Sequence, residues 1–193
     1  QQCLRSGRTV RRSRTSSLKG KGLGKIPNAI PISERPPEAA DRAILGHWEG
    51  DLIQGSKNSY IVTLVERHSR FVMLTKIRDN KTITVISALI KQARELPVEL
   101  YKTLTWDRGA EMTSHTRFTV ATAIQIYFCD PQSQWQRGSN ENTNRLLRQY
   151  FPKGTDLSVH SQQRFNCVAR QLNERPSKTL DYESPTERFN KCV

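Results

Sequence analysis

The sequence of 193 residues has no long apolar run, no paired cysteines and few acidic residues, and each deficit excludes a class of protein. No apolar stretch approaches the roughly 18 residues of a membrane-spanning helix, and the first residues contain no apolar segment of a secretory signal. Cys3, Cys129, Cys167 and Cys192 are far apart and form no CxxC pair, so a structural zinc site is not expected. We therefore expect a soluble, intracellular chain with reduced thiols.

The deficit of acidic residues leaves a strongly basic chain. Lys and Arg number 31 against 18 Asp and Glu, for a formal net charge of +13. A basic surface gains free energy by releasing counterions from a phosphate backbone, which favours a polyanion as partner. An ordinary basic protein without such a partner is the alternative. The length suits one domain with a tail.

The positive charge is densest near the start of the chain. Eight Lys and Arg residues precede the first acid, Glu34, in a segment rich in Ser, Thr and Gly. Because this segment has no periodic apolar residues, we expect residues 1–40 to form a flexible basic tail or linker, with Arg11, Arg12 and Arg14 contacting DNA. A folded core is expected over residues 41–193. The opening Gln-Gln predicts that the chain is a fragment of a longer one.

From residue 46 onward the apolar residues become periodic. We predict strands at 46–52, 60–66, 71–77, 104–107 and 124–128, and helices at 82–96, 114–123, 139–150 and 161–173. The second and third strands form a hairpin, and Ser114 is expected to cap its helix. This order predicts an α/β fold with a mixed five-stranded sheet flanked by helices.

Three acidic residues lie in unlike surroundings: Asp51 in HWEGDLIQG, Asp107 in LTWDRGAEM and Glu141 in WQRGSNENTNRLLRQ. The first two end or interrupt strand-like runs, and the third opens a helix-like one. Hard divalent ions prefer oxygen ligands, and two such ions about 3.5–4 Å apart can activate an oxygen nucleophile and stabilise a leaving oxyanion. The three acids are therefore candidates to bind two Mg²⁺ or Mn²⁺ ions in phosphodiester chemistry.

Each acid also has an ordinary interpretation. Asp51 can be a strand-edge acid, Asp107 a turn-initiating residue and Glu141 a first-turn helix acid favoured by the helix dipole. Glu49 shares the face of Asp51, and Glu111 follows Asp107 by four residues. Either of these two can instead be a ligand, or can support one.

Four segments carry a resemblance to a known family: ISERPPEAADRAILGHWEGDLI, WDRG, WQRGSNENTNRLLRQYFPKGTDLS and LNERPSKTLDYESPTERF. Together they resemble the transposases of the IS-thirty family of bacterial insertion sequences, from Ile32 to the C-terminus. The resemblance implies an integrase-type catalytic core of RNase H-like fold, with an Asp-Asp-Glu triad at Asp51, Asp107 and Glu141. It also implies metal-dependent cleavage and strand transfer on double-stranded DNA, at terminal inverted repeats and target DNA. A homo-oligomer in the bacterial cytoplasm, associated with the nucleoid, would act there.

The sequence departs from the family pattern at two places. Gln134 stands where members usually have Pro, just before Trp135, and the loss of a fixed φ is expected to loosen this loop. Members also carry an N-terminal helix-turn-helix region that recognises the inverted repeats, and no segment here corresponds to it.

The resemblance implies that the loop and helix around Glu141 approach DNA. Trp135, Arg137 and Asn144 are candidate contacts, although Trp135 has core packing as its alternative. On a helix, Asn144 shares the face of Glu141 and can hydrogen-bond substrate or a metal-bound water. His47 is expected to act as a hydrogen-bonding support rather than as a metal ligand.

A basic patch follows on the same segment. Arg145, Arg148 and Lys153 are candidates to hold phosphates, with a solvated surface as the alternative. The sequence as a whole predicts a DNA transposase core. A non-catalytic nucleic-acid-binding module of the same fold, or an RNase H-like nuclease acting on RNA or hybrid strands, remains open. Only a transposase joins a 3′-hydroxyl end to target DNA.

Overall fold

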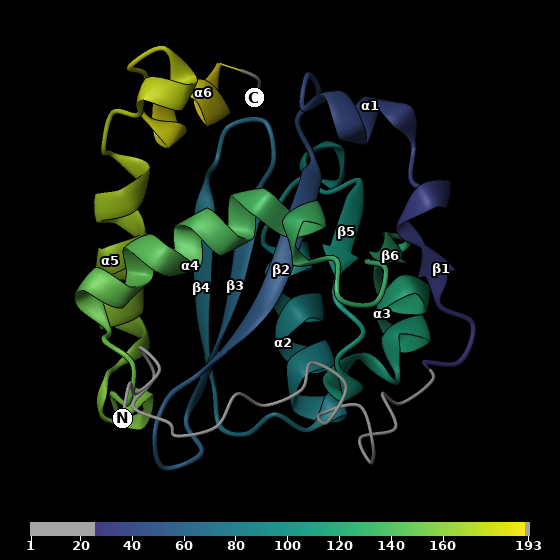
Figure 1. The fold of residues 1–193 in the computed structure, drawn as a ribbon, viewed down its shortest axis with the longest axis horizontal. Helices are drawn as coiled ribbons and strands as arrows, with labels where there is room; N and C mark the ends of the chain where they lie inside the picture. The colour runs from purple at the N-terminus through teal and green to yellow at the C-terminus, as the bar shows by residue number, and fades with distance from the viewer. Residues whose placement is uncertain (1–25, 192–193) are drawn as a thin grey trace, which may run out of the picture.

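The computed structural model describes residues 26–191, and a six-stranded mixed sheet forms its centre, in the order β1-β6-β5-β2-β3-β4 (Figure 1). The strands are β1 (Ile30–Pro31), β2 (His47–Gln54), β3 (Tyr60–Glu66), β4 (Val72–Ile77), β5 (Thr103–Trp106) and β6 (Gln125–Phe128). The helices are α1 (Pro37–Asp41), α2 (Thr82–Arg94), α3 (His115–Thr122), α4 (Gly138–Tyr150), α5 (Gln162–Asn173) and α6 (Pro185–Asn190). The expected DNA contacts Arg11, Arg12 and Arg14 lie outside the described residues.

The α/β class, the mixed sheet and the flanking helices are confirmed, whereas the expected number of five strands is wrong. The sixth strand, β1, pairs in parallel with β6, Ile30 opposite Tyr127. Two residues are too few to show periodicity, so the pattern could not reveal it. Ordered structure thus begins ahead of residue 41.

Ser114 occupies the N-cap position of α3, as expected, but its side chain forms no capping hydrogen bond. Helices α1 and α6 were not predicted, although each begins with Pro at its first turn. The fixed φ of Pro suits that position, so these prolines start short helices rather than only ending others. Ser184 and Glu187 complete a capping box at α6.

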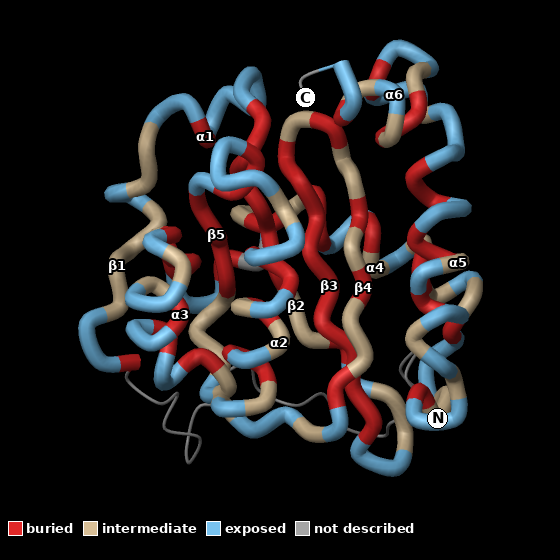
Figure 2. Tube along the Cα trace, turned by 180° about the vertical axis from the view of Figure 1, so that it is seen from behind, coloured by how far each residue is buried: buried red, intermediate tan, exposed pale blue. Residues whose placement is uncertain are grey.

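Helices cover both faces of the sheet, and each face has its own core. In Figure 1 α4 crosses one face of the sheet, and α2 lies behind it. Trp48, Leu64 and Trp106 pack with α2 and α3 on one side. Ile61 and Leu147 belong to the core that α4 and α5 cover on the other. The strand β3, which lies between β2 and the edge strand β4, is buried along its whole length (Figure 2).

The strand β2 separates two kinds of side chain, as its alternation predicted. Trp48 enters the apolar core under α2, while Glu49 and Asp51 face α4. Gly50 lies against the Trp106 ring, and a Cβ added there would come within 2.1 Å of Trp106 Cζ3. Glycine is therefore the residue that lets this ring pack on the backbone between the two acids.

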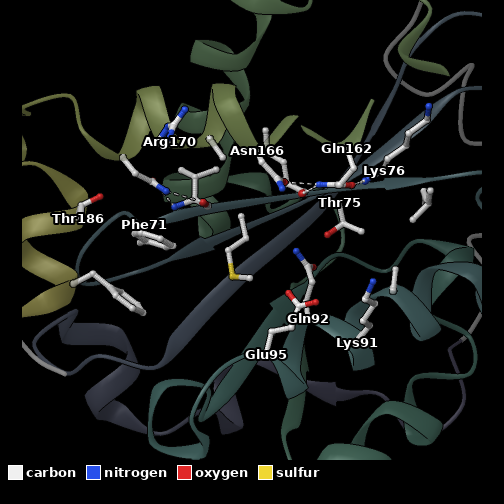
Figure 3. Close-up of a pocket in the computed structure, with 18 of the residues that line it drawn as sticks. Phe71, Thr75, Lys76, Lys91, Gln92, Glu95, Gln162, Asn166, Arg170 and Thr186 are labelled. Carbon is white, nitrogen blue, oxygen red and sulfur yellow. Dashed lines mark hydrogen bonds between the residues drawn. The ribbon is translucent and has the colours of Figure 1, made fainter. Parts of the chain in front are cut away.

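The sheet ends at β4, whose free edge is covered by side chains of α5. Asn173 pairs with both the N–H and the carbonyl of Val72, and Gln162 bonds the Leu74 carbonyl and the Lys76 N–H. These amides take the place of a neighbouring strand and protect the edge from pairing with another chain. The edge opens into a groove of about 1160 Å³ between α2, α5 and α6 (Figure 3).

Among residues 26–191, no helix combines the length and the apolar character needed to cross a membrane.

Candidate active site

The sheet brings Asp51 and Asp107 together through the pairing of β2 with β5. These strands run in parallel with Glu49 opposite Thr105. Continuing this register by two residues brings Asp51 of β2 level with Asp107, the residue that directly follows β5. Residues opposite each other in a parallel pair point to the same face, so both carboxylates lie on the side of α4.

The guanidinium of Arg137 joins the two carboxylates. Its Nη1 lies 3.1 Å from Asp51 Oδ1 and its Nη2 lies 3.0 Å from Asp107 Oδ2, while Nη1 also donates to the Gly50 carbonyl at 2.7 Å. The Arg137 side chain is 8% exposed, against 28% for Asp51 and 43% for Asp107. In this structure the charge of Arg137, a predicted DNA contact, neutralises two neighbouring acids.

The electrostatics of this cluster follow from burial and from the shared cation. Burial raises the pKa of Asp107, and Asp51 adds to the rise, although Arg137 opposes it. Burial alone would lower the pKa of Arg137, but Asp51 and Asp107 outweigh it and raise that pKa. The guanidinium therefore stays charged. The Asp107 carboxylate, in contrast, loses hydration on burial, and the charge of Arg137 does not fully compensate for that loss.

Helix α4 reaches the same cluster through Asn144. Its Nδ2 donates to Asp51 Oδ2 at 2.7 Å, and its buried Oδ1 has no hydrogen-bond partner within the described residues. Glu141 lies one turn earlier on this face and is exposed to solvent. In residues 26–191, no three His, Cys, Asp or Glu side chains converge closely enough to hold a metal ion. The structure thus brings two of the three expected acids together and leaves Glu141 at the rim.

Glu49 has a structural role in holding α4 against β2, which the sequence did not reveal. Its buried carboxylate bonds to Arg67 Nη1 and accepts the backbone N–H of Asn140 at 2.9 Å. The Asn140 side chain in turn donates to the Glu49 carbonyl at 2.9 Å and pairs with Thr63. Glu49 therefore anchors the first turn of α4 to β2. The alternation placed it beside Asp51, but only the tertiary structure shows its partners.

Glu111 lies close to the acids but is bound elsewhere. It accepts a hydrogen bond from Trp106 Nε1 at 3.0 Å and lies against Gly109. Burial raises the pKa of Glu111, and the negative charges of Asp107 and Asp51 add to the rise. It therefore adds negative charge to the site while holding the Trp106 ring in place.

His47 does form the kind of hydrogen bond expected of it, but not to the three acids. Its Nδ1 lies 2.8 Å from Thr103 Oγ1, and its Nε2 faces Glu38 at 3.6 Å. Burial lowers the pKa of His47 to about 4. The neutral ring thus links β2 to β5 through Thr103.

The remaining candidates lie on the outer surface of this region. Trp135 is 71% exposed, so core packing is the wrong interpretation of it. Arg145 and Lys153 are exposed, and Arg148 is half-buried with no hydrogen-bond partner in the described residues at its Nη1. The backbone from Gln134 to Arg137 forms a 3₁₀ turn that runs directly into α4.

Comparison with known proteins identifies what this chain is similar to. Residues 41–134 match the family model described as integrase core domain, which covers β2 to β6 and ends before α4. The transposase InsI for insertion sequence element IS30A of Escherichia coli (strain K12) is 50% identical over 193 residues, which is 100% of this chain and 50% of that protein. The transposase for element IS1086 of Cupriavidus metallidurans is 48% identical over 186 residues, 96% of this chain and 54% of that protein.

A more distant relative shows the same coverage. The transposase for element IS4351 of Bacteroides fragilis is 34% identical over 187 residues, 96% of this chain and 57% of that protein. The chain thus spans about half the length of the curated relatives that it matches. The sheet order, the integrase core match and the identity over the whole chain agree, and the chain belongs to the family of the IS30 insertion-sequence transposases.

Proposed function

We propose that this chain is the catalytic core of a DNA transposase, which cleaves DNA at insertion-sequence ends and transfers the strand to target DNA. The observation that carries the proposal is the pair of carboxylates, Asp51 in β2 and Asp107 directly after the parallel strand β5, with the Arg137 cation between them. Two such acids repel each other unless a positive charge neutralises both. The site is thus built to hold positive charge.

The donor chemistry of the three acids suits divalent metal ions. Carboxylate oxygens are the ligands that Mg²⁺ and Mn²⁺ prefer, and the Arg137 guanidinium already stands where a cation is attracted. Asp51, Asp107 and Glu141 are the groups that would hold two ions. When bound, such ions activate the attacking oxygen and stabilise the leaving 3′ oxygen.

The protein contributes position and charge to this reaction. Asn144 holds one oxygen of Asp51 and leaves Oδ1 bonded to Arg137. Glu49 fixes the first turn of α4, and with it the position of Glu141. For the carboxylates to bind metal, Arg137 must give up its contacts with Asp51 and Asp107, and its freed charge is then available for a phosphate.

The partners belong to the same proposal. Double-stranded DNA, at element ends and at the target, is the substrate, and the exposed Trp135 with Arg145, Arg148 and Lys153 supports contact with it. The active complex is a homo-oligomer that pairs two DNA ends in the bacterial cytoplasm at the nucleoid. The tail residues Arg11, Arg12 and Arg14 add to the affinity for phosphate.

A strand-joining assay tests the proposal. A labelled, pre-cut element end is incubated with target DNA and the chain, with Mg²⁺ or Mn²⁺ or with EDTA. Glu141→Gln and Asp107→Asn are compared with the unmodified chain, and Glu99→Gln, an exposed acid in the short turn before β5, is the control variant. We expect joining that requires metal, Asp107 and Glu141 but not Glu99.

Other outcomes would contradict the proposal in different ways. Hydrolysis without joining, especially of RNA or hybrid strands, would identify a nuclease. Salt-sensitive binding with neither cleavage nor joining would identify a non-catalytic binding module. Joining at the normal rate by Asp107→Asn would show that the carboxylate pair is not the reaction centre.

A further inference from the structure

A second charged cavity lies beside α4, away from the carboxylates. It has a volume of about 540 Å³, within the range of ordinary ligand sites. Its walls are the first turns of α4, the start of β4 and the segment between α5 and α6. Four cations line it, and no acidic residue does: Arg42, Arg70, Arg175 and Lys178. We call this cavity the basic pocket.

The cations of the basic pocket are not held in ion pairs. None of the four forms an ion pair with a carboxylate within residues 26–191. By contrast, Arg188 of nearby α6 and Lys191, which directly follows α6, are both paired with Glu183. Burial lowers the pKa of Arg70, and the like charge of Arg42 lowers it further, while the negative charges of Glu49 and Glu66 oppose this fall without cancelling it. An anion bound between Arg42 and Arg70 would relieve their repulsion.

The neutral groups of the basic pocket are also suited to a phosphate. Ser139, Asn142, Ser177 and Thr179 present hydroxyl and amide donors along its wall. Arg70 donates a hydrogen bond to Ser139 Oγ, which holds the arginine against α4. The first turn of α4, a helix of 13 residues, adds the positive end of its dipole.

The position of the basic pocket relates it to the candidate active site. On α4, Asn142 lines the pocket, whereas Glu141 and Asn144 belong to the flank that faces the carboxylates. In Figure 1 the β3–β4 turn and α6 lie above α4, beyond its upper flank. A helix is about 10–12 Å across, and a DNA strand advances about 3.4 Å per nucleotide. A strand crossing α4 thus spans the two sites with about three nucleotides.

We propose that the basic pocket binds a backbone phosphate of DNA and holds a strand across α4, about three nucleotides from the reaction centre. This inference rests on the proposed transposase function. The pocket would read no sequence, because its donors and cations contact only phosphate. The basic pocket would fix the position of the DNA strand along α4 and would increase the affinity for any DNA duplex.

Binding of a labelled duplex, measured by fluorescence anisotropy in EDTA over a series of salt concentrations, tests the pocket without catalysis. The double variant Arg175→Gln/Lys178→Gln removes two exposed charges of the pocket. The control Lys91→Gln/Arg94→Gln removes two exposed charges from α2, on the other side of the sheet. We expect the slope of log K for DNA binding against log salt concentration to become less steep by about one unit in the pocket variant. In the control variant the slope should change little.

Equal losses in the two double variants would overturn the proposal, because only net charge would then matter. A thermal-unfolding titration with inorganic phosphate separates the sources of the anion. If phosphate stabilises the unmodified chain through Arg175 and Lys178 while DNA binding is unchanged, the pocket serves a free anion and the proposal is wrong. If the unmodified chain does not join strands but the pocket variant has a less steep salt dependence, the transposase function alone is rejected. If the unmodified chain joins strands but the salt dependence of the pocket variant is unchanged, the role of the basic pocket alone is rejected.

Discussion

The most direct test of the candidate site is the removal of the cation that joins its two acids. In Arg137→Gln, Asp51 and Asp107 face each other with no shared charge, and the Gly50 carbonyl loses its donor. Breaking a fully buried ion pair costs about 3–5 kcal/mol. Because both carboxylates are partly exposed, solvent screening reduces this, and we expect a loss of about 2 kcal/mol in the free energy of unfolding without metal. That corresponds to a fall of about 4–8 °C in Tm.

Divalent metal should reverse the loss. In Arg137→Gln no guanidinium competes for the carboxylates, so Mg²⁺ binds more tightly and raises Tm more than it does in the unmodified chain. Thermal and urea unfolding, followed by circular dichroism with EDTA and across a Mg²⁺ titration, measure both effects. The matched control is Arg94→Gln, an exposed arginine of α2 whose loss should change stability by less than about 0.5 kcal/mol.

A double-mutant cycle isolates the contact itself. If the pair contributes as the geometry indicates, Asp51→Asn combined with Arg137→Gln costs less than the sum of the two single changes, by about 0.5–3 kcal/mol. Additive losses would refute a direct interaction between them. Equal Mg²⁺ stabilisation of Arg137→Gln and the unmodified chain would refute the competition between guanidinium and metal.

Three further predictions concern the surroundings of the site. Gly50→Ala should lower the free energy of unfolding by about 1–3 kcal/mol, because its Cβ would meet the Trp106 ring; urea unfolding with an unchanged midpoint would contradict this. Because the folded pKa of Asp107 is raised above its ordinary 3.8, its contribution to stability is full below pH 3.8 and is lost as the pH rises through the folded value. In Asp107→Asn, the free energy of unfolding should therefore fall less as the pH rises from 3.8 through the folded pKa of Asp107, which urea unfolding at a series of pH values measures. An identical pH profile in the variant and the unmodified chain would refute the raised pKa of Asp107. Glu49→Gln should cost about 3–5 kcal/mol, because it leaves the buried Arg67 charge unpaired; a loss below 1 kcal/mol would show that Glu49 does not anchor α4.

The regular elements could be predicted because their patterns are local. The alternation in β2 separated Trp48 from Glu49 and Asp51, and the spacing of apolar residues located α2, α4 and α5 within two residues of their observed ends. Periodicity needs several residues to become visible, so the two residues of β1 and the short α1 and α6 were missed.

The sequence by itself determined the fold class, the positive charge and the family, because these depend on composition, periodicity and motifs that can be read along the chain. Only the tertiary structure decided that Arg137 lies between Asp51 and Asp107, and that Glu49 anchors α4. It also gathered Arg42, Arg70, Arg175 and Lys178 into one pocket. The partners of a charged side chain depend on strand register and helix packing between residues far apart in the chain, and no local pattern records either.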